Sequence, residues 1–387
     1  MTLHPLYGHD EARAMVARSH AAGRLPSSML LHGPKGVGKQ RFALWIAQLS
    51  VCEQPVEEGP CGTCRSCRLA LSLEHPDVHW YMPLPRPKKV AGDRLADALE
   101  DARHEVLARF REQPLQPSHT KEVTGLYIGT VKNVRKRAHV RPSMAPGPVF
   151  VIGDAELLVP QEASQEAANA LLKLLEEPPG DARFILTSSI PGSLLPTIRS
   201  RTVPLHLAPI PEETLRAILM KRLDLGEEEA GRIARLGQGS LGRALGFLPD
   251  DEDHERMNEL RRGAFDILRA ALDKRRSAYA LALAYSASGA RGLIDLLEIL
   301  DEWIRDLGAV VSGTEAPVFH HDTAEVLGKL AAQTGVQAAR VPRALPVVER
   351  AKELARGNVN PQLVVAGLVR ELGEALVPSQ GRPRMTR

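Results

Sequence analysis

The chain has 387 residues, of which 43% are hydrophobic and 25% are charged. This composition is ordinary for a globular protein and excludes wholesale disorder, and the length favours two or three domains. The 50 basic and 47 acidic side chains leave a formal charge of +3, so any contact with nucleic acid must be local. Asp10 and Glu11 lie where a signal peptide needs an apolar core, and we expect a cytoplasmic protein.

Strands and helices alternate in the first part of the chain. In order, we expect a strand from Met29 to Gly33, a helix over 40–49, strands over 149–152 and 184–187, and a helix over 165–176 between those two strands. This alternation predicts a parallel sheet covered by helices on both faces, with ligand chemistry at the carboxyl ends of the strands. We expect residues 1–207 to form this α/β domain.

The remaining segments favour helix, because Ala, Leu, Glu and Arg dominate them and aromatic residues are only 4% of the chain. We expect an insertion at 84–125 that contains an amphipathic helix over 93–111, a lid of three helices within 208–250 (211–223, 227–236 and 240–247), a long helical domain over 251–376, and a mobile basic tail over 377–387. The expected fold class is therefore α/β plus all-α.

All four cysteines of the chain lie within residues 52–67, as Cys52, Cys61, Cys64 and Cys67. The spacing C-x8-C-x2-C-x2-C, with glycines and a proline between, lets four thiolates converge on one tetrahedral Zn²⁺. Four protein ligands leave no open position, so such a zinc ion is structural. The alternatives are four unrelated buried thiols or a redox pair.

The segment GPKGVGKQ, residues 33–40, matches seven of the eight positions of a phosphate-binding loop. Gly33, Gly36 and Gly38 would let backbone N–H groups approach phosphate oxygens, and Lys39 would neutralise their charge. Gln40 stands where the magnesium-binding hydroxyl is needed. Binding of ATP or ADP is one interpretation, and a Gly-rich turn without a ligand is the other.

The second predicted strand ends at a carboxylate that fits metal chemistry, Asp154. The next position, which activates water in related ATPases, is Ala155, and Glu156 comes one residue too late to point the same way. We therefore expect ATP hydrolysis by this chain to be weak or absent.

Several motifs occur in the order found in one family. They are Leu6 to His9 with GRLPSSMLLHGPKGVGK, the cysteine loop, NALLKLLEEPP at 169–179, and LLPTIRSRT. Together they resemble the clamp-loader AAA+ family over Leu6 to about Leu376. The resemblance implies a RecA/Rossmann-like AAA+ domain with a zinc-binding insertion, a helical lid, and a C-terminal helical collar that oligomerises. The segment 84–125 exceeds the family pattern.

The resemblance also implies partners. These are gamma/tau and delta subunits in a hetero-pentamer of the DNA polymerase III clamp loader, and, through the complex, the sliding clamp and primed DNA at the replisome. The defective nucleotide loop favours a non-hydrolysing member that braces the ring. The alternatives are a gamma/tau-type ATPase subunit and a zinc-dependent DNA-binding protein with a vestigial AAA+ core.

Three basic features take their interpretation from the resemblance. Arg201 in Ser200-Arg201-Thr202 corresponds to an arginine finger that acts on a neighbour's ATP in trans; the bland alternative is a surface arginine, with Arg199 nearby. Arg243 corresponds to a second-sensor arginine on the lid, or it pairs with an acidic neighbour. The run VKNVRKR, 131–137, is expected to begin a helix and either meets DNA phosphates or forms a solvated face.

Overall fold

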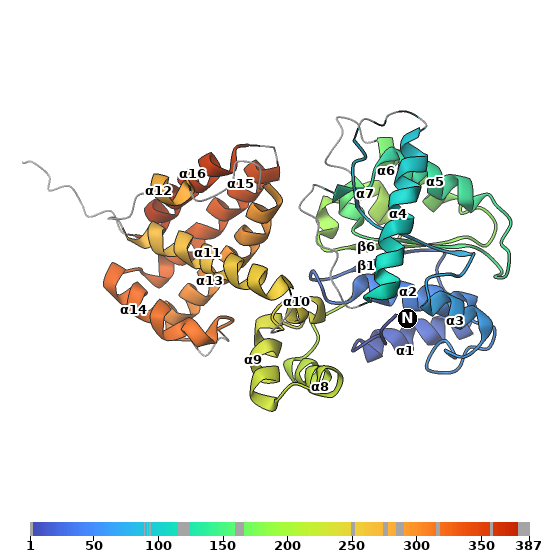
Figure 1. The fold of residues 1–387 in the computed structure, drawn as a ribbon, viewed down its shortest axis with the longest axis horizontal. Helices are drawn as coiled ribbons and strands as arrows, with labels where there is room; N and C mark the ends of the chain where they lie inside the picture. The colour runs from blue at the N-terminus through green and yellow to red at the C-terminus, as the bar shows by residue number, and fades with distance from the viewer. Residues whose placement is uncertain are drawn as a thin grey trace, which may run out of the picture. The chain divides into compact units, whose positions relative to one another are not determined.

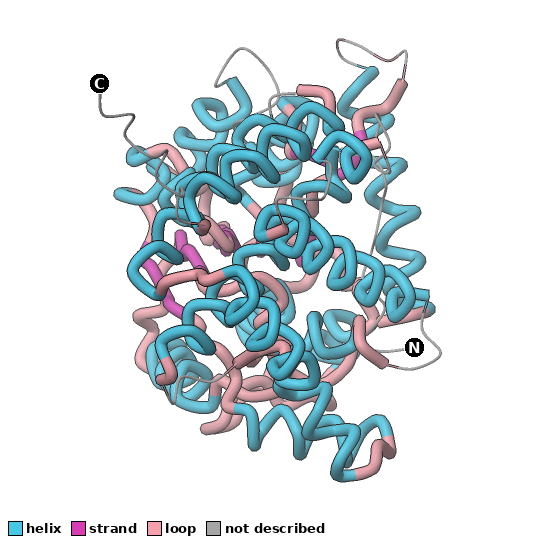
Figure 2. Tube along the Cα trace, turned by 90° about the vertical axis from the view of Figure 1, so that its left-hand side faces the viewer, coloured by secondary structure: helices cyan, strands magenta, loops and turns pink. Residues whose placement is uncertain are grey.

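The structure is a computed structural model of the chain that describes residues 3–88, 90, 92, 94–114, 124–158, 166–248, 252–273, 278–283, 290–314, 318–356 and 359–377. Within these ranges, helix is the dominant secondary structure (Figure 2). The chain divides into two compact units, residues 1–245 and 246–387. No helix in the described ranges has both the length and the apolar character needed to span a membrane.

A five-stranded parallel sheet forms the centre of the first unit. Its strands, in spatial order, are β2 (Val78–Tyr81), β5 (Val149–Ile152), β6 (Arg183–Ser188), β1 (Ser28–His32) and β7 (Val203–His206). Met29 lies opposite Ile185 of β6 on one side and Val203 of β7 on the other. β1 is thus interior, and the chain leaves it beside the carboxyl ends of two neighbouring strands.

Helices cover both faces of this sheet. They are α1 (Asp10–Ala21), α2 (Lys39–Val51), α3 (Arg65–Leu71), α4 (Arg94–Glu112), α5 (Ile128–Ala138), α6 (Glu166–Glu176) and α7 (Pro196–Ser200). Successive strand residues point to opposite faces, so Leu31 packs into the core that α2 and α4 share, and Leu30 into the core under α5 and α6. Figure 1 shows α2 and α3 on one side of the sheet and α5, α6 and α7 on the other.

The segment expected as an insertion begins and ends in a small antiparallel pair. Leu84 of β3 (Leu84–Pro85) lies opposite Gly125 of β4 (Thr124–Gly125). The two ends of the segment 84–125 therefore lie side by side, which lets it be long without disturbing the sheet. Its described helix, α4, lies one residue away from the expected 93–111.

The three expected lid helices are present as α8 (Glu212–Leu223), α9 (Glu227–Gly237) and α10 (Leu241–Leu245). They pack around Leu215, Leu219 and Ile233, which are fully buried. These helices belong to the same compact unit as the sheet. The boundaries of a separate lid domain, 208–250, stay a prediction.

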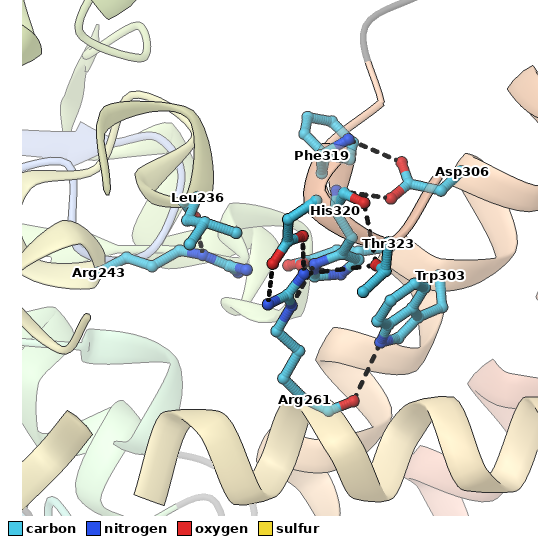
Figure 3. Close-up of polar contacts among 10 residues, drawn as sticks. Leu236, Arg243, Arg261, Trp303, Asp306, Phe319, His320 and Thr323 are labelled. Atoms are coloured by element: carbon cyan, nitrogen blue, oxygen red, sulfur yellow. Dashed lines mark hydrogen bonds and ion pairs between the residues drawn. The ribbon is translucent and has the colours of Figure 1, made fainter. Parts of the chain in front are cut away.

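The second unit is entirely helical in its described part. Its helices are α11 (Glu252–Leu272), α12 (Ala278–Ala282), α13 (Ala290–Ser312), α14 (Ala324–Thr334), α15 (Leu345–Arg356) and α16 (Pro361–Leu376), with short 3₁₀ turns at His321–Thr323 and Ala338–Ala344. Buried Trp303 stacks on His320, with ring centroids 4.0 Å apart, and Asp306 accepts the backbone N–H groups of Phe319 and His320 (Figure 3). Residues 378–387 of the expected tail lie outside the described residues.

The expected fold class, α/β plus all-α with a parallel sheet, is confirmed. One detail was wrong: the basic run 131–137 does not begin its helix, because α5 begins at Ile128. The basic side chains Arg135, Lys136 and Arg137 therefore lie in its last turn, where cations complement the negative end of the helix dipole.

Candidate functional site

The four cysteines meet at one point between two helices. Cys52 is the C-cap of α2, Cys61 and Cys64 follow in the loop, and Cys67 lies in the first turn of α3. Their Sγ atoms all lie within 4.8 Å of one another. Residues that are 15 positions apart in the sequence thus form one cluster of potential metal ligands.

The geometry of the cluster fits a tetrahedral ion. Four thiolates at about 2.3 Å from one zinc lie roughly 3.8 Å from one another. The Sγ of Cys52 is 3.6 Å from that of Cys61, which is 3.9 Å from that of Cys67. Backbone N–H groups also point at the sulfurs, as in the contact from Cys64 N to Cys61 Sγ of 3.4 Å. The chain thus provides a complete set of soft ligands.

The pKa values of two thiols move in opposite directions. The backbone N–H groups of Cys64 and Thr63 lower the pKa of Cys61 to about 6, which favours the thiolate that a metal binds. Burial raises the pKa of the fully buried Cys67 thiol. A cation at the centre of the cluster would offset that cost of burial, because it stabilises every thiolate around it.

The cysteine loop is shaped by a contact within itself and by a contact with α2. Glu53 accepts hydrogen bonds from the backbone N–H and the hydroxyl of Ser66, at 3.0 and 2.9 Å. Gly59, with a φ of 139°, lies directly against the Trp45 ring, where a Cβ would overlap the indole. The loop is therefore shaped by α2 as well as by its cysteines.

The candidate nucleotide loop joins β1 to α2 and lies against the lid. Gly36 has a φ of 74°, and its carbonyl accepts the N–H of Gly242 in α10 at 3.2 Å. A Cβ on Gly36 would overlap the hydroxyl of Ser240. The backbone curve that a phosphate needs is therefore present, but a neighbouring loop and helix pack on it.

Lys39 has all three of its ammonium donors engaged within the protein. Its Nζ donates to the carbonyls of Gly33 and Pro34, at 3.0 and 2.7 Å, and to the hydroxyl of Ser189 at 2.9 Å. The side chain is buried, and burial lowers its pKa, although Asp154 and Glu156 oppose that shift. A phosphate group would have to displace at least one of these partners to bind Lys39 directly.

Gln40 connects the loop to the expected metal-binding carboxylate. Its Nε2 donates to Asp154 Oδ2 at 3.0 Å, and its Oε1 accepts the indole N–H of Trp80 at 3.1 Å. The structure thus brings Gln40, next to Lys39, into contact with Asp154. No sequence motif indicated Trp80, which lies in β2, or Ser189, which follows β6.

The two residues after Asp154 begin a short 3₁₀ turn. Ala155 is fully buried and begins a 3₁₀ turn. Glu156 Oε1 accepts the backbone N–H of Ser189 at 2.8 Å, which anchors the loop that supplies a partner to Lys39. Glu156, which follows the position where related ATPases carry the base, therefore makes a structural contact.

Arg243 lies on the lid helix that packs on the loop. Its Nε donates to the carbonyl of Leu236 at 2.7 Å (Figure 3), and its backbone N–H donates to Ser240 Oγ at 3.0 Å. These contacts hold the backbone and the Nε of Arg243 in place beside the Gly36 turn. Its roles as a second sensor and as the partner of an acidic residue both stay predictions.

Arg201 lies just past α7 and is only partly exposed. It forms an ion pair with Glu176 at the end of α6, with its Nε 2.6 Å from Glu176 Oε1. Its Nη1 donates to the carbonyl of Thr197 at 3.1 Å. These contacts of the predicted finger are with α6 and α7 and not with this chain's own nucleotide loop. Glu176 is its acidic partner.

The comparison with protein families matches the description "DNA polymerase III, delta subunit" to residues 8–211, which is more than half of the chain. The chain belongs to this family. The matched range contains the cysteine cluster, the nucleotide loop and Arg201, and the membership confirms the AAA+ clamp-loader resemblance.

The individual relatives are also subunits of DNA polymerase III. The DNA polymerase III subunit delta prime of Escherichia coli strain K12 is 28% identical over 61% of this chain and 58% of its own length. That of Pseudomonas aeruginosa PAO1 is 33% identical over 47% of this chain and 43% of its own. The gamma/tau subunit of Mycobacterium tuberculosis H37Rv is 28% identical over 55% of this chain and 30% of its own. The chain spans about half the length of the delta prime relatives.

Proposed function

We propose that this chain is a delta prime subunit of a bacterial DNA polymerase III clamp loader that does not hydrolyse ATP itself. In this role it braces an assembly with delta and gamma/tau subunits in the cytoplasm. The ATP-bound neighbours open the sliding clamp and place it on primed DNA. The family membership and the delta prime relatives support this assignment.

The arrangement around Gln40 is the observation that carries the proposal. A carboxamide bridges Asp154 and Trp80 where an ATPase needs a magnesium ion held by a hydroxyl and a carboxylate. Lys39 is saturated by protein acceptors, and the position after Asp154 is an alanine. Each of these features removes a different part of the hydrolytic machinery. Together they favour delta prime over the gamma/tau alternative.

The cysteine cluster in this proposal holds a structural Zn²⁺. Cys52, Cys61, Cys64 and Cys67 fit the ligand number, ligand type and spacing that zinc requires. A closed site of four thiolates leaves no position for water or substrate. The ion would order a loop that is too small to have a hydrophobic core.

Arg201 is the proposed arginine finger, acting in trans on the ATP of a neighbouring subunit. Its pairing with Glu176 is no obstacle, because an ion pair at the protein surface contributes only about 0–1 kcal/mol. A transferring phosphoryl group is a stronger acceptor than one carboxylate, so it can compete for the guanidinium.

Purified chain alone tests the absence of hydrolysis. We expect it to bind zinc and to turn over ATP no faster than a Lys39→Ala variant, with or without primed DNA. Zinc is measured by elemental analysis and turnover by phosphate release. Hydrolysis that DNA stimulates and that Lys39→Ala abolishes would instead support a gamma/tau-type subunit. Tight DNA binding by the lone chain that weakens steeply with salt would support the DNA-binding alternative.

A reconstituted complex tests the finger. We expect Arg201→Ala to assemble normally with the delta and gamma/tau partners and to slow hydrolysis at one neighbouring site by about 10³-fold. Arg199→Ala, two residues away, is the matched control and should hydrolyse ATP at the normal rate. Equal rates for wild type and Arg201→Ala would remove Arg201 from this role.

A further inference from the structure

The Gln40 carboxamide lies between three neighbours, Asp154, Trp80 and Gly153. Its two ends are bonded to Asp154 and Trp80, and Gly153 lies so close that a Cβ there would be 2.7 Å from Gln40 Oε1. An amide can point its NH₂ or its oxygen at a carboxylate, and only the NH₂ binds well. The indole N–H of Trp80 needs the oxygen, so it selects the orientation in which the NH₂ faces Asp154.

Trp80 is in turn held by α4, the helix of the segment 84–125. The Phe110 ring packs on the Trp80 ring, with centroids 4.9 Å apart at an interplanar angle of 39°. Leu107, one turn earlier on α4, lines a small cavity together with Trp80. Arg103 Nη1 donates to the Trp80 carbonyl at 3.3 Å. One face of α4 therefore contacts both the ring of Trp80, through Phe110, and its backbone, through Arg103.

Buried charges fix α4 in place. Arg103 is only 5% exposed and pairs with Glu100, whose carboxylate also accepts Arg137 of α5 at 2.8 Å. The guanidinium of Arg103 lies over the Tyr81 ring, 4.9 Å from its centroid. The Arg103–Glu100 pair lies within α4 and moves with it, so the contacts that hold the helix are those to other elements. A shift of α4 would break the bond from Arg103 to the Trp80 carbonyl and would separate Glu100 from Arg137. α4 is thus docked on β2 rather than loosely attached.

We propose that α4 is an internal brace that acts through Trp80 to keep the Gln40 amide on Asp154, so that the metal-binding position of the nucleotide loop stays closed. Trp80 is a positioning residue in this arrangement, and Phe110 positions Trp80. The inference rests on the proposed function, and it gives the segment 84–125 a role within the chain. The amide NH₂ supplies to Asp154 the positive partner that a metal ion would supply in an ATPase.

Hydrogen exchange of the tryptophan indole N–H groups, observed by NMR on the full chain, tests the brace. The chain has three tryptophans, and a Trp80→Phe variant assigns the Trp80 signal. We expect Phe110→Leu to speed exchange of the Trp80 indole N–H by about tenfold, because the ring loses its support and the bond to Gln40 weakens. Glu105→Ala, at an exposed position of the same helix, is the matched control and should leave exchange unchanged.

Mn²⁺ reports directly on the closed position. We expect added Mn²⁺ to broaden the Trp80 indole signal, relative to those of Trp45 and Trp303, in Gln40→Ala and Phe110→Leu. Wild type and Glu105→Ala should show no such selective broadening, because Asp154 is covered. A folded Phe110→Leu variant with wild-type exchange and no broadening would overturn the brace.

Gln40→Ala keeps the proposal testable if Phe110→Leu does not fold. Removing the acceptor should also speed Trp80 indole exchange about tenfold. Unchanged exchange in Gln40→Ala would show that the indole makes no bond to Gln40, and the proposal would fail. These measurements use neither ATP nor partner subunits. A chain that failed to assemble with delta and gamma/tau subunits while the exchange and Mn²⁺ results held would contradict the proposed function and not the brace.

Discussion

The cysteine cluster and the nucleotide loop lie at opposite ends of one helix, α2, and differ in how completely their ligand-binding groups are available. The cluster retains all four ligands that its chemistry needs, and the sulfurs lie at distances that one ion explains. The loop retains its glycines and its lysine, but protein groups occupy the side chains that would meet phosphate and metal. One end of α2 presents four potential metal ligands, and at the other end the side chains of Lys39 and Gln40 are bonded to protein groups.

The difference has a physical reason in what surrounds each end of the helix. A zinc ion cannot be replaced by a few hydrogen bonds, because it orders a loop that has no core of its own. A phosphate loop lies between a sheet and a helix that are stable without it, so polar side chains can satisfy its donors and acceptors. The cluster should therefore depend on its ion, and the loop should not depend on nucleotide.

The largest expected effect is loss of the metal. Cys67→Ser replaces a fully buried ligand with a hydroxyl that binds zinc poorly. We expect the zinc content to fall from about one ion per chain to near zero, with the loss of stabilisation on the order of 10 kcal/mol that such an ion provides locally. Elemental analysis and proteolysis of the cysteine loop measure both effects. Arg65→Ala, an exposed non-ligand in the same loop, should retain its zinc; full zinc content in Cys67→Ser would contradict the four-ligand site.

Acid should lower the unfolding free energy of the chain through His79 of β2, the strand that contains Trp80. His79 of β2 is buried beside Arg137 and Arg103, and burial first and these cations second lower its pKa to about 4. The unfolded chain binds this proton near the ordinary pKa of 6.5, so the unfolded state gains protons first. His79 thus contributes its full stability above about pH 6.5 and loses about 3 kcal/mol by pH 4.

His79→Gln isolates this contribution, because the glutamine takes up no proton. The difference in unfolding free energy between wild type and variant, measured by urea at each pH, should change across this window and be constant above it. The subtraction cancels acid-induced loss of zinc, which both proteins share. A difference that is independent of pH would mean that His79 is not buried as described.

The sequence predicted the interior strands of the sheet and the cysteine cluster, but it did not predict the edge strands of the sheet. The strand 149–152 is apolar on both faces and was predicted at its true bounds, and the cysteine spacing predicted the cluster. β2 and β7 were not predicted. They are the two edge strands of the sheet, and they contain His79, Pro204 and His206, which interrupt any apolar run.

The contacts of the nucleotide loop were beyond prediction for a different reason. The missing hydroxyl at Gln40 is visible in the sequence, but its partners come from β2 and from the end of β5, 40 and 114 positions away. A motif reports what a side chain lacks, whereas its replacement depends on which strands the fold places side by side. The same holds for Ser189, whose hydroxyl accepts from Lys39 across 150 positions.

Lys39→Ala tests whether the lysine has become structural. The change removes three hydrogen bonds from a buried ammonium and leaves the Ser189 loop without its partner. We expect the unfolding free energy to fall by about 2–3 kcal/mol, and by the same amount with and without ADP. Lys35→Ala, at an exposed position of the loop, should cost much less. A loss that appears only when ADP is present would restore the loop as a working nucleotide site.

The smallest expected effect separates backbone strain from packing of the loop on the lid. Gly36 and Gly23 have similar positive φ values, 74° and 65°, but a Cβ on Gly36 would overlap Ser240 and a Cβ on Gly23 would meet nothing within 4 Å. Gly23→Ala should therefore cost about 1 kcal/mol from strain alone, and Gly36→Ala about 2 kcal/mol. Adding Ser240→Gly to Gly36→Ala should remove the excess, because the overlapping hydroxyl is gone. Equal costs for the two single variants, measured by urea unfolding, would mean that the lid does not pack on the loop in solution, and the closed state of the loop would then depend on Gln40 and Lys39 alone.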